Sequence, residues 1–289
     1  MRAVVLDPNG RPQLADHPEP QGAGVLVHVL ACGLCGSDVE KLGHGHAGAV
    51  LGHEVAGILE DGSQATVMHR VPCGSCERCR AGHESTCEEF QHLRLEPGGF
   101  AERLRATHVV PTDGLGVDAI WVEPVACILR AAERIPGGRV LVVGCGAVGR
   151  LWVQVLRRCG SEVVVTDPRA DRVEGAKRLG ARVDAGPVDA AVVTAHGGLN
   201  DALARCEPGG TVLVFAAPGA SIPVAVETIY RRELSVVGSR SATPAHFDAA
   251  VAVLPELDLP EVTTLPLERF AEGVDLYRRG ETLKVVFTP

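Results

Sequence analysis

The chain has 289 residues, of which 46% are apolar and 22% are charged, so it has the composition of a folded protein and room for two hydrophobic cores. Its formal net charge of −8 argues against a nucleic-acid or anionic-membrane surface, because such a surface needs clustered Lys and Arg. We find no signal peptide and no apolar run that could span a bilayer, so we expect a cytoplasmic protein with a small-molecule partner.

The first part of the chain, up to about residue 120, is rich in Gly, Pro and His and predicts a β-rich, loop-rich region. We expect short strands over residues 1–7, 25–29 and 108–110. From Arg139 on, strands and helices alternate, which predicts a doubly wound parallel α/β sheet. We expect strands at 140–143, 163–165, 190–193, 211–215 and 234–237, and helices at 147–158 and 169–179.

Only residues 180–189 lie between Leu179 and the predicted strand at 190, which is too few for a further strand and helix. We therefore expect the crossover helix at this point to be missing or very short. The alternation ends near Arg240, and the remaining residues predict helices at 244–253 and 267–278 and a closing strand at 283–287.

Residues 144–149, Gly-Cys-Gly-Ala-Val-Gly, match G-x-G-x-x-G between a predicted strand and a predicted helix, the context of a dinucleotide-binding loop. Gly144 would permit the tight turn, Gly146 would admit the pyrophosphate, and Gly149 would let helix and strand pack closely. The phosphates would then meet the helix N-terminus. A glycine-rich turn of another α/β fold is the alternative, but the context favours the dinucleotide.

Asp167 ends the next predicted strand, where a carboxylate can bind the adenosine ribose hydroxyls and favour NAD over NADP. Arg169 and Arg172 lie close enough to soften this preference, since an arginine there can accept a ribose phosphate. The candidate cofactor-binding residues are Gly144, Gly146, Ala147, Val148, Gly149, Asp167, Arg172 and Arg240.

Ten cysteines in a chain without an export signal indicate thiols or metal ligands rather than disulfides. Four of them, Cys73, Cys76, Cys79 and Cys87, have the spacing C-x2-C-x2-C-x7-C and predict a closed, structural zinc site. A zinc-ribbon nucleic-acid module is the rival interpretation, which the neighbouring glutamates make unfavourable. The four scattered cysteines are expected to be small buried side chains, and they are Cys127, Cys145, Cys159 and Cys206.

A second candidate metal site combines Cys35 and His53 with a carboxylate. Thiolate, imidazole and carboxylate suit zinc, and three protein ligands leave the fourth position open for water or an alcohol oxygen. The third ligand could be Glu123 or Glu54. Taken singly, these residues are more often a buried thiol, a hydrogen-bonded histidine and a helix-start carboxylate.

These motifs together resemble the zinc-containing medium-chain dehydrogenase/reductase family of alcohol, sorbitol and threonine dehydrogenases. The matching segments follow the family order and cover nearly the whole chain; they are 35–38 (Cys-Gly-Ser-Asp), 52–57 (Gly-His-Glu-Val-Ala-Gly), the four-cysteine loop, 98–102 (Gly-Gly-Phe-Ala-Glu), 123–124 (Glu-Pro), the 144–149 loop and 284–286 (Lys-Val-Val).

The resemblance implies a GroES-like catalytic domain over 1–124 and 242–289, with a structural zinc lobe at about 73–87, and an inserted Rossmann NAD-binding domain over 125–241. It implies that Cys35, His53 and Glu123 surround the catalytic zinc, with Glu54 as an adjacent or exchanging ligand. Cys73, Cys76, Cys79 and Cys87 would hold the structural zinc. Dimers or tetramers are usual in the family, and the strand at 233–238 would form the pairing edge.

The chain departs from the family pattern at Glu40, where a histidine commonly ends a proton relay. His44 or His46 could replace that histidine, although both are expected to be exposed. The segments between Cys35 and His53 and between His53 and Cys73 are also shorter than in typical members.

The expected reaction is the interconversion of an alcohol or polyol and its ketone, with hydride passed to or from NAD. Ser37 would be the first proton acceptor, followed by Glu40, a nearby histidine or water. The alternatives are a zinc-free quinone or enone reductase of the same superfamily and a catalytically silent NAD-binding protein that keeps its structural zinc. Polyols, secondary alcohols and amino alcohols remain open as substrates.

Overall fold

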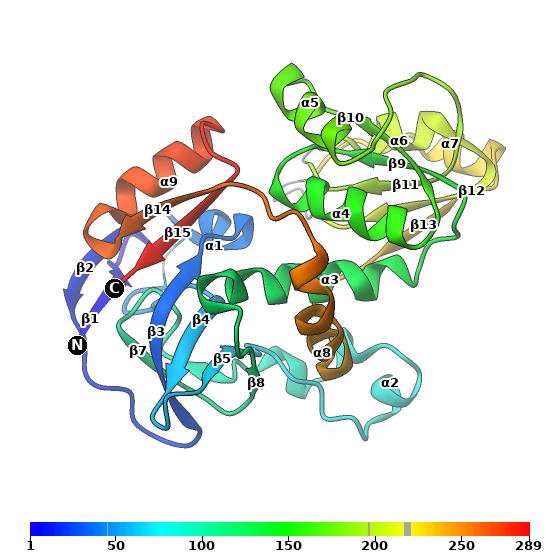
Figure 1. The fold of residues 1–289 in the computed structure, drawn as a ribbon. Coiled ribbons are helices and arrows are strands. Elements are labelled where there is room, and N and C mark those ends of the chain that lie inside the picture. Colours follow the sequence, from blue (N-terminus) through cyan, green and yellow to red (C-terminus); the bar gives the residue numbers. More distant parts are fainter. Residues whose placement is uncertain (45, 196, 217–220) are drawn as a thin grey trace. The chain divides into compact units, whose positions relative to one another are not determined.

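The computed structural model describes residues 1–44, 46–195, 197–216 and 221–289. The chain separates into two compact units. The first unit contains Met1–Ala126, Ala242–Glu256 and Glu261–Pro289, and the second contains Cys127–Ser241 and Leu257–Pro260. Figure 1 shows both units in the colours of the sequence. None of the helices in the described residues is both long and apolar enough to cross a membrane.

The first unit is built on a curved sheet in which the chain's end pairs with its beginning. β15 (Lys284–Thr288) pairs antiparallel with β3 (Val25–Gly33), and β3 pairs antiparallel with β4 (Glu54–Leu59). The remaining strands of this unit are β1 (Arg2–Leu6), β2 (Pro12–Asp16), β5 (Gln64–Val67), β6 (Leu95–Glu96), β7 (Arg103–Ala106), β8 (Val109–Pro111) and β14 (Val262–Pro266). The closing strand and the strands predicted at 1–7, 25–29 and 108–110 are therefore confirmed.

Helices of the first unit are mostly short. They are α1 (Gly36–Lys41), α2 (Glu77–Arg80), α8 (Pro244–Val253) and α9 (Phe270–Arg279), with 3-10 turns η1 (Glu84–Thr86), η2 (Glu89–Gln91), η3 (Gly116–Trp121), η4 (Leu254–Glu256) and η5 (Leu267–Arg269). The helices predicted at 244–253 and 267–278 are confirmed as α8 and as η5 with α9. α3 (Val122–Ala132) begins in the first unit and ends in the second.

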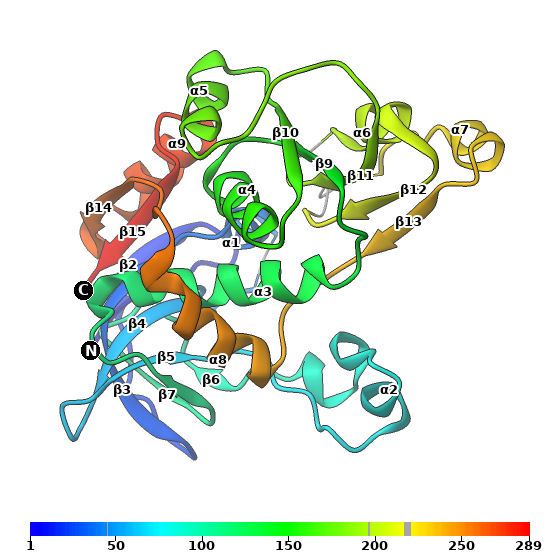
Figure 2. The ribbon, with the colours of Figure 1, turned by 45° about the vertical axis from the view of Figure 1, so that its right-hand side comes forward.

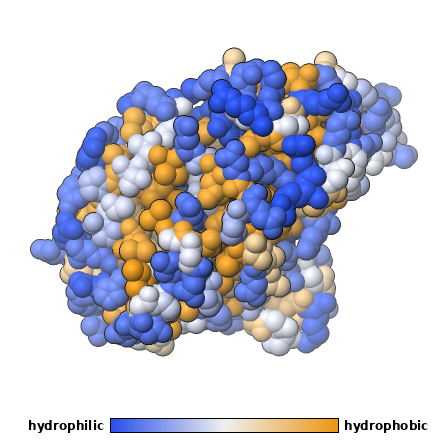
Figure 3. All heavy atoms as spheres, viewed as in Figure 1, coloured by the Kyte–Doolittle hydropathy of each residue, from blue (hydrophilic) through white to orange (hydrophobic). Residues whose placement is uncertain are grey.

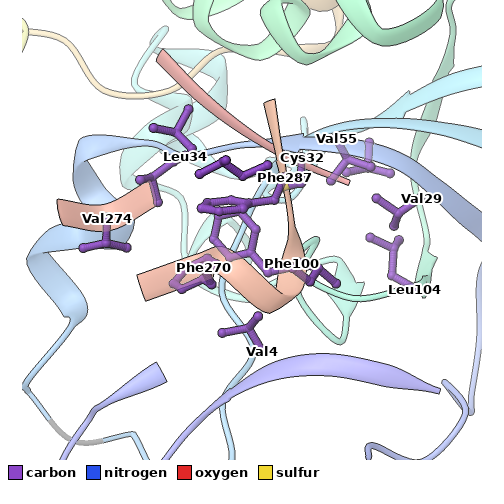
Figure 4. Packing of buried hydrophobic residues seen from close by; sticks show 14 of the residues in the cluster. Val4, Val29, Cys32, Leu34, Val55, Phe100, Leu104, Phe270, Val274 and Phe287 are labelled. Atoms are coloured by element: carbon purple, nitrogen blue, oxygen red, sulfur yellow. The ribbon is translucent and has the colours of Figure 1, made fainter. Parts of the chain in front are cut away.

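Three phenylalanines from distant parts of the chain meet in the core of the first unit (Figure 4). The ring centroid of Phe100 lies 4.9 Å from that of Phe270 and 5.5 Å from that of Phe287, both in edge-on geometry. Edge-on packing of this kind adds about 0.5–1.5 kcal/mol per pair to the burial of the rings. Cys32 packs into the same cluster and is 1% exposed, so it is a core residue.

The second unit holds a five-stranded parallel sheet in the order β10-β9-β11-β12-β13. Its strands are β9 (Arg139–Val143), β10 (Glu162–Thr166), β11 (Val188–Val193), β12 (Cys206–Val214) and β13 (Ser235–Gly238). Helices α4 (Ala147–Arg158), α5 (Ala170–Arg178), α6 (Leu199–Arg205) and α7 (Val226–Arg231) follow four of these strands. α4 packs on β9 and β10, and α6 packs on β11 and β12 (Figure 2). The predicted parallel α/β sheet is confirmed.

No helix lies between α5 and β11, where all residues are described, so the predicted loss of the crossover helix is confirmed. A single β-bridge between Val164 and Arg182 stands where a further strand would run. The sheet is therefore a reduced version of the doubly wound fold, with β10 as an outer strand.

The prediction that all four scattered cysteines are buried is wrong for two of them. Cys145 and Cys206 are buried, but Cys127 is half-buried and Cys159 is exposed. Cys159 follows the last residue of α4 as its C-cap, and this position faces the solvent where the helix ends. The space-filling view shows that hydrophilic and hydrophobic residues both reach the viewed surface (Figure 3).

Candidate functional site

The glycine loop of the second unit joins β9 to α4. Gly144 has a φ of +104°, which favours glycine, and Gly146 is the N-cap residue of α4. A Cβ atom on Gly149 would overlap the carbonyl oxygen of Gly144, so this glycine lets α4 start close to the strand. A Cβ on Gly146 would meet nothing nearer than Arg172 Nη1 at 3.9 Å, so the space above Gly146 is available to a ligand.

Asp167 lies directly beside this loop. Its Oδ2 accepts a hydrogen bond from the Cys145 backbone N–H at 2.8 Å, and its Oδ1 accepts one from the Arg169 N–H at 2.9 Å. Arg169 in turn pairs with Asp171 at 3.1 Å. A carboxylate is thus held at the edge of the glycine loop, where a ribose would bind. Ala147 and Val148 form the first turn of α4, and their backbone N–H groups belong to the helix N-terminus.

The first metal-ligand group lies where β3 and β4 pair. Gly33 of β3 lies opposite Glu54, the first residue of β4. Cys35 follows two residues after Gly33 and is the N-cap of α1, and His53 precedes Glu54. The ligand atoms of Cys35, His53 and Glu54 all lie within 4.8 Å of one another. The strand pairing therefore assembles a thiol, an imidazole and a carboxylate from two segments.

Asp38 supports this group from inside α1, where it is 1% exposed. Its carboxylate accepts hydrogen bonds from the backbone N–H groups of Cys35 at 3.2 Å and Gly52 at 3.4 Å, and it lies 3.4 Å from His53 Nδ1. The contact to Nδ1 fixes the imidazole and leaves Nε2 for a cation. The role of Asp38 does not follow from the sequence alone, although this residue closes the Cys-Gly-Ser-Asp motif.

The electrostatics around His53 favour a positive charge. Burial disfavours a charged ring, but Asp38 and Cys35 outweigh it and raise the pKa of His53 well above its ordinary value. The pKa of Asp38 is lowered, because the favourable interaction with His53 exceeds the cost of burial. The site thus has an excess of negative groups, which a metal cation would neutralise.

Glu54 has a second partner on the far end of the chain. Lys284 Nζ donates to Glu54 Oε2 in an ion pair in which both residues are at most 5% exposed. The same ammonium lies 5.2 Å from the centre of the Trp121 ring. Although burial disfavours the charged ammonium, Glu54 and other negative groups raise the pKa of Lys284. Lys284 therefore remains charged beside Glu54.

A second metal-ligand group shares His53 with the first. The ligand atoms of His53, His69 and Glu123 also lie within 4.8 Å of one another. Glu123 is 7% exposed in the first turn of α3, and His69 follows β5. His69 is not predictable from the sequence, since a single histidine after a strand belongs to no motif. The structure brings Cys35 together with His53 and Glu54, and Glu123 together with His53 and His69.

The four-cysteine loop forms a separate cluster. The Sγ atoms of Cys73, Cys76, Cys79 and Cys87 lie within 4.8 Å of one another. Backbone N–H groups point at the sulfurs: Cys76 N–H donates to Cys73 Sγ at 3.3 Å, and Cys79 N–H donates to Cys76 Sγ at 3.4 Å. The apolar content is small, with Phe90 packed against the buried cysteines. This arrangement fits a tetrahedral zinc ion that stabilises the lobe.

The thiols of this cluster differ in acidity. The Ser75 backbone N–H and hydroxyl lower the pKa of the Cys73 thiol to about 6. Burial raises the pKa of Cys79 to about 12. A bound cation would favour the thiolate form of all four, since metal binding and proton loss are coupled.

The remaining predicted residues surround these groups. Ser37 is exposed on α1, and its hydroxyl donates to Cys35 Sγ at 3.4 Å. Glu40 is exposed three residues later on the same helix, and His44 and His46 are exposed, as expected. Arg240 follows β13 with an exposed side chain, and its carbonyl oxygen accepts a hydrogen bond from Arg130 Nη1 at 2.8 Å.

Comparisons with known proteins find related dehydrogenases. The sequence profile of the alcohol dehydrogenase GroES-like domain matches residues 21–113. A sorbitol dehydrogenase of Halalkalibacterium halodurans is 30% identical over 348 alignment positions, which cover 100% of this chain and 99% of the relative. A D-altritol 5-dehydrogenase of Agrobacterium fabrum is 30% identical, with 88% of each protein covered.

The fold comparison gives the same result. An alcohol dehydrogenase from Thermus sp. ATN1 has a TM-score of 0.82 and 26% identity to this chain, and both chains are covered to 100%. The alignment with the Halalkalibacterium protein needs 348 positions for the 289 residues of this chain, so the chain is shortened internally.

Proposed function

Because the chain belongs to the zinc-containing medium-chain dehydrogenase/reductase family, as its full-length similarity to a sorbitol dehydrogenase shows, we propose that it interconverts a polyol and its ketone with NAD. The observation that carries this proposal is the thiol, imidazole and carboxylate group of Cys35, His53 and Glu54. The relatives named for sorbitol and D-altritol support a polyol over a simple alcohol as the substrate.

Zinc is the metal that these donors fit best. Cys35, His53 and Glu54 supply sulfur, nitrogen and oxygen from three side chains, which leaves one tetrahedral position for a substrate oxygen. Asp38 keeps the imidazole of His53 oriented through Nδ1. The four cysteines of the 73–87 lobe would hold a second, structural zinc with no open position.

NAD is the dinucleotide that the second unit favours. Asp167 would repel a ribose phosphate and can accept hydrogen bonds from ribose hydroxyls. Arg169 is paired with Asp171, so its guanidinium is directed to another partner. Arg172 lies beside Gly146, where it can contact a pyrophosphate oxygen.

When bound, zinc supplies a Lewis acid for the substrate hydroxyl and NAD supplies the hydride acceptor. The chain's own residues then move the proton. Ser37 Oγ lies beside Cys35 Sγ, so we assign it as the first acceptor of the hydroxyl proton. Glu40 shares an exposed face of α1 with Ser37 and takes the place of the relay histidine.

The proposal also includes a cytoplasmic homo-oligomer. β13 is the outer strand of the parallel sheet, and Val236 on it is 41% exposed. An exposed outer strand of this kind can pair with the same strand of a second copy. Size-exclusion chromatography with light scattering would test this, and a monomer at working concentration would contradict it.

The deciding experiment is a screen of metal-replete protein for NADH formation from polyols, with secondary alcohols and amino alcohols as comparison classes. We expect the fastest turnover with a polyol and NAD, slower turnover with NADP, and about two zinc ions per chain. Cys35→Ala should lower turnover sharply, because the ion loses its thiolate ligand. Turnover that persists in full after zinc has been removed from wild type would exclude zinc catalysis, and turnover of quinones or enones alone would favour the zinc-free reductase class.

A further inference from the structure

We propose that the first unit has a second seat for the catalytic ion, formed by His53, His69 and Glu123, which overlaps the Cys35 seat through the shared His53. The Cys35 seat is the group of Cys35, His53 and Glu54, and the His69 seat is the group of His53, His69 and Glu123. This inference rests on the proposed function, because it concerns the same metal. It adds His69 as a ligand that the motifs do not include.

The spacing of the donor atoms supports the His69 seat. Ligand atoms in a tetrahedral zinc shell with Zn–N bonds of about 2.0 Å are roughly 3.3 Å apart. The three donor atoms of the His69 seat lie within 4.8 Å of one another, as do those of the Cys35 seat. Small side-chain rotations would therefore close either shell. The ring centroids of His53 and His69 are 4.6 Å apart, which is close enough for one ion to contact both rings.

Backbone hydrogen bonds hold His69 in place, and burial restricts Glu123. Arg94 N–H donates to the His69 carbonyl oxygen at 2.9 Å, and the preceding residue, Met68, donates its N–H to the His108 carbonyl oxygen at 3.0 Å. Glu123 is 7% exposed and follows Trp121, which is 1% exposed. A metal site needs ligands on such fixed segments, because ordering a mobile side chain costs conformational entropy and so weakens metal binding.

The charges around the two seats favour cation binding at the His69 seat as well. Glu54 is already paired with Lys284, which neutralises much of its negative charge. Glu123 supplies a second buried carboxylate for the ion. An ion that passes from the Cys35 seat to the His69 seat exchanges sulfur for nitrogen and keeps His53, and each seat leaves a position open for substrate. Two imidazoles and a carboxylate also suit metals that bind thiolate less well than zinc does.

Cobalt(II) binding to a protein without the Cys35 thiol tests the inference directly. We expect Cys35→Ala to bind about two cobalt ions per chain in equilibrium dialysis, one in the four-cysteine lobe and one in the His69 seat. The spectrum of the second equivalent should show ligand-field bands and lack the sulfur-to-cobalt charge-transfer band that wild type shows.

Removing His69 in the same background should abolish that second equivalent. We expect Cys35→Ala/His69→Asn to bind the second cobalt ion at least about tenfold more weakly than Cys35→Ala. The matched control is Cys35→Ala/His28→Asn, because His28 is an exposed histidine on β3 and lies in neither seat. Circular dichroism and the first cobalt equivalent show whether each variant is folded.

Two results would overturn the proposal: a folded Cys35→Ala protein that binds only one cobalt ion, or a His69→Asn double variant that binds the second ion as tightly as the control. The proposed function has a separate readout in the turnover of polyols by wild type. If the Cys35→Ala variants bind cobalt as described but wild type oxidises no polyol, the His69 seat stands and the proposed activity is rejected.

Discussion

Asp38 contacts His53 but belongs to neither group of metal ligands, so Asp38→Asn measures how much the orientation of His53 contributes to zinc affinity. The buried carboxylate accepts hydrogen bonds from two backbone N–H groups and lies beside His53 Nδ1, with N···O distances of 3.2–3.4 Å. The asparagine has nearly the same shape but no charge, and its NH2 group replaces one of the two acceptor oxygens, so that the three N–H groups around it can no longer all be accepted. Loss of such a support typically lowers zinc affinity 10- to 100-fold, which is about 1.4–2.7 kcal/mol.

Competition with a chromogenic chelator measures the affinity of the protein for the catalytic zinc. The zinc of the four-cysteine lobe, which the substitution does not touch, serves as an internal reference. Asp171→Asn is the matched control, because Asp171 is an exposed aspartate on α5. We expect the control to retain the wild-type zinc affinity. Equal affinities of Asp38→Asn and wild type in folded protein would refute the assignment of Asp38 as the orienting group.

Four further predictions follow from particular contacts. Lys284→Met leaves the carboxylate of Glu54 buried without its cation and should lower the free energy of unfolding by about 3–5 kcal/mol in urea titrations, whereas Lys284→Arg should cost less. Gly146→Ala has space for its methyl group, so its melting temperature should stay near that of wild type while NADH binding, followed by fluorescence, weakens. Gly149→Ala should instead lower the melting temperature, because its methyl group would overlap backbone. Chelation of zinc from the four-cysteine lobe should expose residues 73–87 to protease, and unchanged cleavage after metal removal would contradict a structural role for this ion.

The sequence allowed the local parts of the fold to be predicted with close boundaries. The apolar run at 140–143 and the glycine loop fix β9 and the start of α4, because strand burial and the tight turn are both decided by neighbouring residues. The pattern at 244–253 likewise predicted α8 to the residue. By contrast, α6 and α7 span only seven and six residues, too few for a helical period to stand out.

Strand β12 shows why glycine-rich segments mislead. It was predicted over 211–215, yet it begins at Cys206 and passes through Gly209, whose φ is +80°. The partner strand β11 has a register shift between Val188 and Ala190, so the glycines lie beside an irregular stretch of the ladder. A glycine-rich segment of this kind predicts a turn from its local sequence. It becomes a strand because it pairs with its neighbours in the sheet, and not because of its intrinsic propensity.

The candidate site was only partly predictable for a related reason. Cys35, His53 and Glu54 could be found from motifs, because they lie in short segments of fixed spacing. The pairing of Glu54 with Lys284 joins residues 230 positions apart, and the approach of His69 to His53 depends on the sheet and its following loop. The first contact comes from the pairing of β3 with β4 and β15, and the second from the pairing of β4 with β5, which no local pattern reports.

The lone bridge at Arg182 also bears on solubility. An outer strand offers unpaired N–H and C=O groups to any passing chain and so promotes aggregation. At the edge of β10, Arg182 donates its N–H to Val163 at 2.8 Å and accepts one from Val165 at 2.9 Å. Its guanidinium adds a charge beside Glu162 at 3.3 Å. Arg182 thus pairs two outer polar groups of β10 at the position where a doubly wound sheet usually carries a further strand, and this leaves fewer unpaired backbone groups for another chain to bind.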